Sequence, residues 1–293
     1  MATLRDIKKR IRAVKNIEKI TRAMKMVAAA KLRKAQERMM AARPYARHLR
    51  SVIASVAARV PADVHPLLRP NPPGQGVSAL VVTADRGLCG SFNAAILRRT
   101  RRFIAEQEQD GQAPVRFYLA GRKAAAYFKA HPADTFGTTQ DFFRDLNFMH
   151  GAKVAEQLVT DYLTRRPSRL HVIYNEFKSA VAQKLVVESL LPFSPESFPA
   201  AERSDYIYEP ADPSAVLTSL LKLHLEVQIY TIFLESYAAE QAARMTAMEN
   251  AADNAVELNA DLTLAYNRAR QAGITKEIAE IVEIGRASCR ERV

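Results

Sequence analysis

The stretch LRDIKKRIRAVKNIEKITRAMKMVAAA, residues 4–30, decides the fold of this chain. Its apolar side chains recur at steps of three or four residues, which places them in one stripe along a helix. The stripe consists of Leu4, Ile7, Ile11, Val14, Ile17, Ile20, Met24 and Val27. So narrow a stripe is typical of a coiled coil, with one three-residue slip that would overwind it locally. We therefore expect a second long helix elsewhere in the chain to pack against this one.

The same helix is strongly basic. The first 50 residues hold 16 Lys and Arg against three acids, a net charge of +13, whereas the whole chain of 293 residues carries +12. Such a helix could bind nucleic acid, anionic lipid or a partner with acidic elements. Residues 1–60 contain a single aromatic, Tyr45, so the stacking platform that single strands need is missing. The charge also surrounds the helix, which argues against a membrane-bound face.

The helical pattern runs over residues 4–60 and is interrupted only by Pro44. A proline inside a helix removes one hydrogen bond and costs about 3 kcal/mol, which predicts a kink or a break near Arg43. Five prolines in residues 61–76 indicate a linker.

In the middle of the chain, segments with the apolar pattern of a strand alternate with segments that have the pattern of a helix. Alternating strands and helices predict a mostly parallel sheet with helices on its faces. The expected strands are residues 77–83, 115–120, 170–175 and 180–188, and the expected helices are 92–108, 122–130 and 149–165. Residues 191–213, rich in proline, indicate a second linker.

A second long helix is predicted over residues 214–282. Residues 212–282 hold ten acids against five bases, a net charge of −5. Its opposite charge makes it the natural partner of the basic N-terminal helix. The expected domains are therefore an N-terminal shaft helix (1–60), an α/β foot (77–205) and a C-terminal shaft helix (212–282). The two shaft helices would pair antiparallel, with the α/β domain inserted between them.

No complete catalytic motif stands out. Residues 85–91, DRGLCGS, follow a strand and open a helix, but they lack the third glycine of a dinucleotide site and the Gly-Lys-Ser/Thr of a P-loop. A tight structural turn is the better interpretation, and Cys89 is expected to be a small buried residue rather than a nucleophile. Glu277 and Glu280 are interpreted as an exposed or partner-facing surface, not an acid/base pair. We expect no cofactor and no metal.

Cysteine content and hydropathy bear on location. Cys89 and Cys289 are far apart in the sequence and form neither a disulfide framework nor a metal-ligand spacing, which favours a reducing, cytoplasmic-side compartment. No stretch approaches the roughly 18 uncharged apolar residues that a membrane span needs. The N-terminus also lacks the apolar core of a signal peptide.

Several blocks together resemble the gamma subunit of F-type ATP synthase. They match that family in order and span residues 1–282. The blocks are ITRAMKMVAAAK (20–31), DRGLCG (85–90), YIYEP (206–210), QAARMTAM (241–248) and YNRARQAGIT (266–275). The resemblance implies a long antiparallel coiled coil of the terminal helices with an inserted Rossmann-like α/β domain. It also implies a non-catalytic rotor subunit of a proton-translocating ATP synthase.

The resemblance implies partners as well. In that family the shaft turns inside a ring of alpha and beta subunits, and the foot lies beside the epsilon subunit and the c-ring. The complex is peripheral at the cytoplasmic face of the inner membrane, or at the matrix face in mitochondria. By resemblance, Met24 faces a lever of a catalytic subunit, Arg244, Gln271 and Thr275 reach its catch loop, and Tyr206, Tyr208 and Glu209 meet the c-ring.

Other interpretations of these residues stay open. Met24 could be part of the coiled-coil core, Arg244 could form an intrahelical ion pair, and Gln271 and Thr275 could be exposed polar groups. Two other classes also stay open for the whole chain. These are a basic coiled-coil protein that binds nucleic acid and an α/β enzyme with helical arms, which would need a ligand pocket at the carboxyl edge of the sheet.

The last residues depart from the family. Residues 283–293, EIGRASCRERV, stand where the family continues with a Gly-Ala tail, and they resemble the translation of a common sequencing adapter. We expect this segment to be non-native and Cys289 to carry no function.

Overall fold

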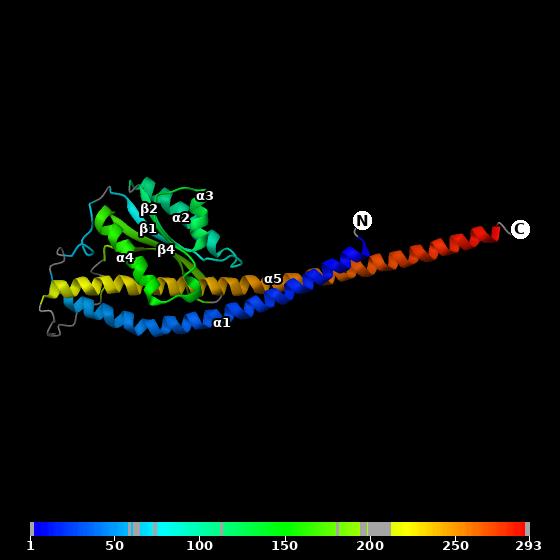
Figure 1. The fold of residues 1–293 in the computed structure, drawn as a ribbon, viewed down its shortest axis with the longest axis horizontal. Helices are drawn as coiled ribbons and strands as arrows, with labels where there is room; N and C mark the ends of the chain where they lie inside the picture. The colour runs from blue at the N-terminus through cyan, green and yellow to red at the C-terminus, as the bar shows by residue number, and fades with distance from the viewer. Residues whose placement is uncertain are drawn as a thin grey trace. The chain divides into compact units, whose positions relative to one another are not determined.

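The computed structural model describes residues 3–57, 60, 65–72, 75–111, 114–179, 182–193, 198 and 212–290, except the side chains of 213 and 283–290. The chain divides into two compact units. One contains Met1–Val27 and Ala247–Val293, and the other is Ala28–Thr246. Figure 1 labels the elements along the chain.

Two long helices begin and end the described chain. Helix α1 covers Leu4–Ala57 and α5 covers Pro213–Arg290. Of the kink or break predicted near Arg43, the break is wrong, because α1 continues across Pro44. Met39 and Leu49, on either side of the proline, are buried in the core of Ala28–Thr246. Their packing offsets the hydrogen bond that Pro44 removes. Helix α5 also extends beyond the predicted end at residue 282.

A five-stranded sheet forms the centre of the larger unit. Its order is β3-β2-β1-β4-β5, with β5 antiparallel to β4 and all other pairs parallel. The strands are β1 (Val77–Val82), β2 (Val115–Ala120), β3 (Thr135–Thr139), β4 (Arg169–Phe177) and β5 (Gln183–Leu191). The predicted mostly parallel sheet is confirmed. Strand β3 was not predicted, and β5 lies three residues later than expected.

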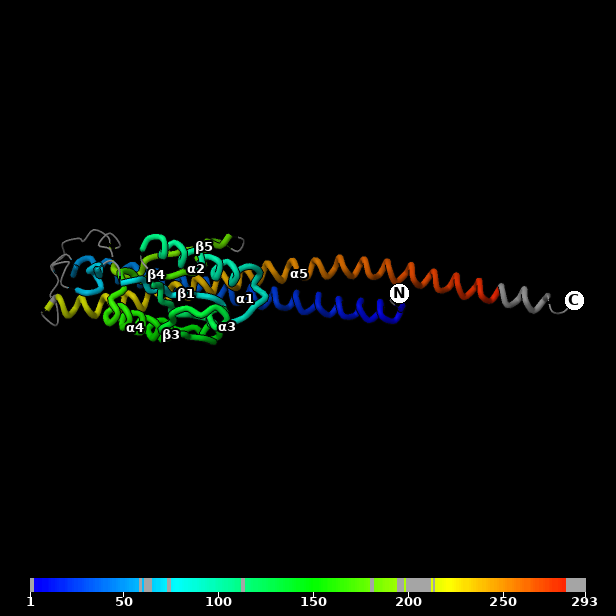
Figure 2. The backbone as a smooth tube through the Cα atoms, turned by 90° about the horizontal axis from the view of Figure 1, so that it is seen from above, coloured from blue at the N-terminus to red at the C-terminus, as the bar shows by residue number. Residues whose placement is uncertain are grey.

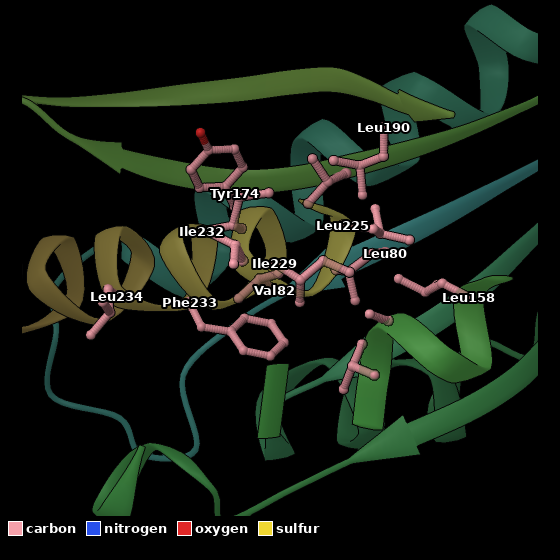
Figure 3. Packing of buried hydrophobic residues seen from close by; sticks show 14 of the residues in the cluster. Leu80, Val82, Leu158, Tyr174, Leu190, Leu225, Ile229, Ile232, Phe233 and Leu234 are labelled. Carbon is pink, nitrogen blue, oxygen red and sulfur yellow. The ribbon is translucent and has the colours of Figure 1, made fainter. Parts of the chain in front are cut away.

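Both faces of this sheet are covered by helices. Leu80 and Val82 of β1 pack with α4 (Phe148–Arg165) and with the apolar face of α5, as Figure 3 shows for Leu158 and Ile229. The alternate residues Ala79 and Val81 pack on the other face with α2 (Phe92–Gln109) and α3 (Arg122–Ala130). Burial on both faces explains the continuous apolar run of β1.

Local signals set two of the helix starts. Asn147 caps α4, since its side-chain Oδ1 accepts a hydrogen bond from the His150 amide at 3.3 Å. Gly121 precedes α3 with a φ of +98°, and a Cβ there would lie 2.1 Å from the Thr83 carbonyl oxygen. Only glycine fits that close approach of two backbones.

The smaller unit is a two-helix coiled coil. Figures 1 and 2 both show the N-terminal part of α1 alongside α5, and the Lys25 Nζ donates to Glu249 Oε1 at 2.6 Å. The predicted antiparallel pairing of the terminal helices is therefore present here.

The contact seam differs from the predicted stripe. The more buried positions follow a regular alternation of four and three residues: Ile7, Ile11, Val14, Glu18, Thr21 and Lys25 on α1, and Met248, Ala252, Ala255, Asn259, Leu262 and Tyr266 on α5. Ile17, Ile20 and Val27 are exposed, so the predicted slip in the heptad is wrong. The seam shares Ile7, Ile11 and Val14 with the predicted stripe and departs from it at Glu18, because a strict alternation of four and three residues keeps successive side chains facing the partner helix.

One 18-residue window of α5 is apolar enough, by length and composition, to cross a membrane, with a mean hydropathy of 1.2. The sequence predicts no run of 18 uncharged apolar residues, whereas a window of this kind can include up to two charged residues. In the fold, 44% of this window is buried. Its apolar composition is thus used in part for packing within the protein.

Candidate functional site

The residues singled out by resemblance fall in separate places. Met24 is half-buried on α1, and Gln271 and Thr275 are exposed on α5, all in the coiled-coil unit. Arg244 lies on α5 in the larger unit. Tyr206, Tyr208 and Glu209 lie outside the described residues.

Gln271 and Thr275 occupy a part of α5 that has no partner helix in the described chain. Lys25 contacts Glu249, and the two helices are antiparallel. Gln271 therefore lies opposite residue 3, just before the start of α1 at Leu4. A Cβ added at Gly273 would meet no atom within 4 Å. The structure therefore does not bring Met24 and Gln271 together, since about 33 Å of helix separates Glu249 from Gln271 at 1.5 Å per residue.

The side chains of Gln271 and Thr275 differ in their hydrogen bonds within the chain. The Thr275 hydroxyl donates to the Gln271 backbone oxygen at 3.0 Å. Its oxygen can still accept a hydrogen bond from another molecule. No hydrogen bond of the Gln271 amide group is found among the described residues, so both its donors and its acceptor are available.

Arg244 is engaged within the chain. Its guanidinium donates to the Gly87 carbonyl oxygen at 3.1 Å and pairs with Glu240 Oε1 at 2.6 Å. Arg244 is 9% exposed and Glu240 is 4% exposed. Burial raises the pKa of Glu240, and the adjacent Arg244 opposes that shift. The intrahelical ion pair considered in the sequence analysis is present, and the Gly87 contact is additional.

The loop of residues 85–90, which Arg244 reaches, is held by its own side chains. Asp85 Oδ1 accepts hydrogen bonds from the backbone amides of Arg122 at 2.9 Å and Asp141 at 3.0 Å. The Arg122 amide belongs to the first turn of α3, where α/β proteins bind phosphate. A carboxylate of the chain itself thus occupies that position, which supports a structural turn over a phosphate site.

Cys89 is part of the same turn. It is 1% exposed, and the Asn93 Nδ2 donates to its Sγ at 3.1 Å. Burial is the largest cause that raises the pKa of the Cys89 thiol, which disfavours the reactive thiolate. These observations support the interpretation of Cys89 as a buried packing residue.

A cavity of about 670 Å³ opens between this loop and α5. It lies at the carboxyl ends of β1 and β2, the edge of a parallel sheet where ligands bind in other α/β proteins. Its charged lining is mainly basic and consists of Lys31, Arg86, Arg122, Arg144 and Arg244 against Asp85, Asp141 and Glu240. Among the described residues, no group of three or more His, Cys, Asp or Glu could hold a metal ion.

Sequence reasoning missed the connection between Arg244 and Gly87. The spacing of Glu240 and Arg244 indicated an ion pair on one helix face. Nothing in the sequence could place the Gly87 carbonyl against that face, because 157 residues separate the two partners.

Comparisons with known proteins agree with the coiled coil and the inserted sheet. The ATP synthase family model matches residues 3–286. The ATP synthase gamma chain of Chloroherpeton thalassium is 43% identical over 96% of this chain and 97% of the relative. That of Chlorobaculum tepidum is 44% identical with the same coverage. The chain belongs to the ATP synthase gamma chain family.

Solved structures show the same fold. A chain of the Euglena gracilis mitochondrial ATP synthase superposes with a TM-score of 0.70 at 22% identity, covering 99% of this chain and 96% of that one. A chain from the central stalk and c-ring of the Tetrahymena thermophila enzyme gives 0.60 at 26% identity, covering 79% and 99%. None of these comparisons supports the nucleic-acid-binding alternative.

Proposed function

We propose that this chain is the central rotor of a proton-translocating ATP synthase, which couples rotation of a membrane ring to ATP synthesis or hydrolysis in a ring of alpha and beta subunits. The observation that carries the proposal is family membership across residues 3–286. The antiparallel coiled coil and the α/β foot are the parts that such a rotor needs. The chain itself is proposed to be non-catalytic.

A rotor must act by touching identical subunits differently. A contact shifts a conformational equilibrium only by its difference in affinity for the two states. Moving one site from mostly open to mostly closed takes a difference of about 5.5 kcal/mol. The shaft must therefore be stiff, and two paired helices are stiffer than one.

The basic first helix gives the shaft its charge. Its net charge of +13 over 50 residues fits acidic segments on the surrounding subunits. Met24, half-buried beside this seam, is proposed to face a lever of a catalytic subunit. Arg86 and Arg144 add further cations around the loop of residues 85–90.

The free end of α5 is proposed to reach a catch loop. Gln271 and Thr275 are one helical turn apart, share a face and are exposed, so they can present two polar groups to one loop. Tyr206, Tyr208 and Glu209 are proposed to meet the c-ring, beside the epsilon subunit. The complex would then be peripheral at the cytoplasmic face of the inner membrane, or at the matrix face in mitochondria.

Replacing Gln271 and Thr275 with alanine tests this proposal. The double variant is reconstituted with alpha and beta subunits, and steady-state ATPase is measured. We expect assembly to be intact and turnover to fall about 30-fold, since two neutral hydrogen bonds contribute about 1 kcal/mol each. Thr160→Ala is the matched control, because the Thr160 hydroxyl makes the same bond one turn back, to Glu156, on the foot. Equal turnover in both variants would refute the contact role.

A further inference from the structure

We propose that Arg244 and Glu240 form a clasp that fixes the loop of residues 85–90 to the shaft helix α5, so that the loop and the helix move as one body. This makes Arg244 a positioning residue for the loop. The role of the clasp in coupling rests on the proposed rotor function, whereas the contacts that form it do not.

The clasp is buried, and its two contacts share one nitrogen, Nη2 of Arg244. One guanidinium of Arg244 bridges Glu240 Oε1 at 2.6 Å and the Gly87 carbonyl oxygen at 3.1 Å. The side chains of Arg244 and Glu240 are only 11% and 6% exposed. These two contacts hold Nη2 between α5 and the loop, and the other N–H donors of the guanidinium have no hydrogen-bond partner among the described residues.

The loop needs an outside anchor. Leu88 has a φ of +61° and is not glycine, so its backbone is in a conformation that L-residues rarely adopt. Its apolar side chain is 63% exposed, so Leu88 itself contributes little packing, and Cys89 is the loop residue that packs in the core. Asp85 and Asn93 hold the two ends of the loop to the sheet domain. Among the described residues, the Arg244 bond to Gly87 is the hydrogen bond that ties the loop to α5.

A buried ion pair is a poor device for stability alone. Desolvation of two charges offsets most of their attraction, and an apolar pair of equal volume often stabilises a protein as well. The second bond, from Arg244 to Gly87, is one that an apolar pair cannot make. The pair therefore fits a role in fixing the position of the loop.

Cys89 reports directly on the clasp. It lies two residues from Gly87 and is 1% exposed, so a thiol reagent reaches it only when the loop opens. The experiment uses the full chain with Cys289→Ser, which leaves Cys89 as its single thiol. We expect Arg244→Met to speed modification by a disulfide reagent at least tenfold. Arg101→Met removes an exposed arginine from α2 and should leave the rate unchanged.

In Arg244→Met, a change in thiol chemistry cannot mimic the expected result. Arg244 lowers the pKa of Cys89, so its removal raises that pKa and slows the reaction of an equally exposed thiol. A second variant, Arg244→Met with Glu240→Leu, keeps a similar side-chain volume and leaves no buried charge unpaired. It should also release the loop. Because Glu240 raises the pKa of Cys89 more than Arg244 lowers it, the rates of the double variant and the parent are compared per thiolate, with the thiolate fraction measured from the pH dependence of the reaction.

Hydrogen exchange separates loop opening from general unfolding. Faster Cys89 modification with unchanged amide exchange in β4 supports the clasp. An unchanged rate in both variants overturns it, and so does faster modification accompanied by equally faster exchange in β4. These measurements need no partner subunit, so they can fail while the rotor function holds. In the reconstituted complex the same variants should lower ATPase activity severalfold relative to Arg101→Met. Equal turnover would show that the clasp plays no part in coupling rotation to catalysis.

Discussion

His224 illustrates how burial at one residue sets a pH response. Its ring lies 5.1 Å from the ring of Phe193, and burial, with a smaller contribution from Arg50, lowers the pKa of His224 to about 4. In the unfolded chain the histidine pKa is about 6.5. The unfolded state therefore binds more protons between these values, and stability is lost as the pH falls below 6.5.

We expect this residue to cost about 2 kcal/mol of folding stability between pH 7.5 and pH 5. His224 lines a cavity of about 710 Å³ together with Glu188 and Glu235. Burial raises the pKa of each of these two carboxyl groups, which acts in the opposite direction on the pH dependence of stability. The comparison must therefore be between variants. His224→Leu should lose less stability on acidification than the parent chain in urea unfolding, whereas His48→Gln, at an exposed site, should behave as the parent. Identical acid sensitivity in His224→Leu would contradict the assignment.

At the scale of elements, the seam of the coiled coil contains one unsatisfied polar group. The Oδ1 of Asn259 is buried with no hydrogen-bond partner among the described residues. A buried group of this kind costs about 1–3 kcal/mol. Polar residues at seam positions commonly fix the register of paired helices at such a cost.

Replacing Asn259 with leucine should therefore stabilise the pairing of α1 and α5 by about 1 kcal/mol. Thermal melting followed by far-ultraviolet circular dichroism measures the change. Asn254→Leu places the same substitution at an exposed position of the same helix and should have little effect. If Asn259→Leu melts at no higher a temperature than Asn254→Leu, the buried Oδ1 of Asn259 does not destabilise the pairing of the helices.

The long elements could be predicted from sequence because their periodicity is strong. Strands β1 and β2 and helices α2, α3 and α4 match their predicted ranges closely. The seam of the coiled coil could not be predicted from the sequence. Two neighbouring stripes on α1 fit a helical period, and only the partner helix selects between them. Strand β3, with the sequence TFGTT, contains no fully buried residue and so carried no alternating signal.

The candidate site was predictable only in part. Motifs located Arg244, Gln271 and Thr275, and the structure shows that Gln271 and Thr275 are exposed. The partner of Arg244 at Gly87 depends on how the sheet domain packs on α5, which is a long-range property of the fold. Tyr206, Tyr208 and Glu209 lie outside the described residues and their contacts stay a prediction.

At the scale of the whole molecule, we expect the isolated chain neither to bind nor to hydrolyse ATP. The amides of Arg122 and Asp141, which could have received a phosphate, are bonded to Asp85. Isothermal titration calorimetry of the pure chain with ATP and Mg²⁺ should show no binding at micromolar ligand. Replacing Asp85 with asparagine removes this internal negative charge and serves as a comparison. Micromolar affinity in the parent chain would be incompatible with a non-catalytic rotor.

Rotation itself is the most direct test of the central claim. Alpha and beta subunits from the same source are fixed to a surface with this chain, and a particle is attached through Arg101→Cys on α2 in a Cys289→Ser background. We predict that adding ATP turns the particle in one direction, in steps, and that rotation stops when ATP is removed. A ring that holds the chain and hydrolyses ATP while the particle only diffuses would contradict the account.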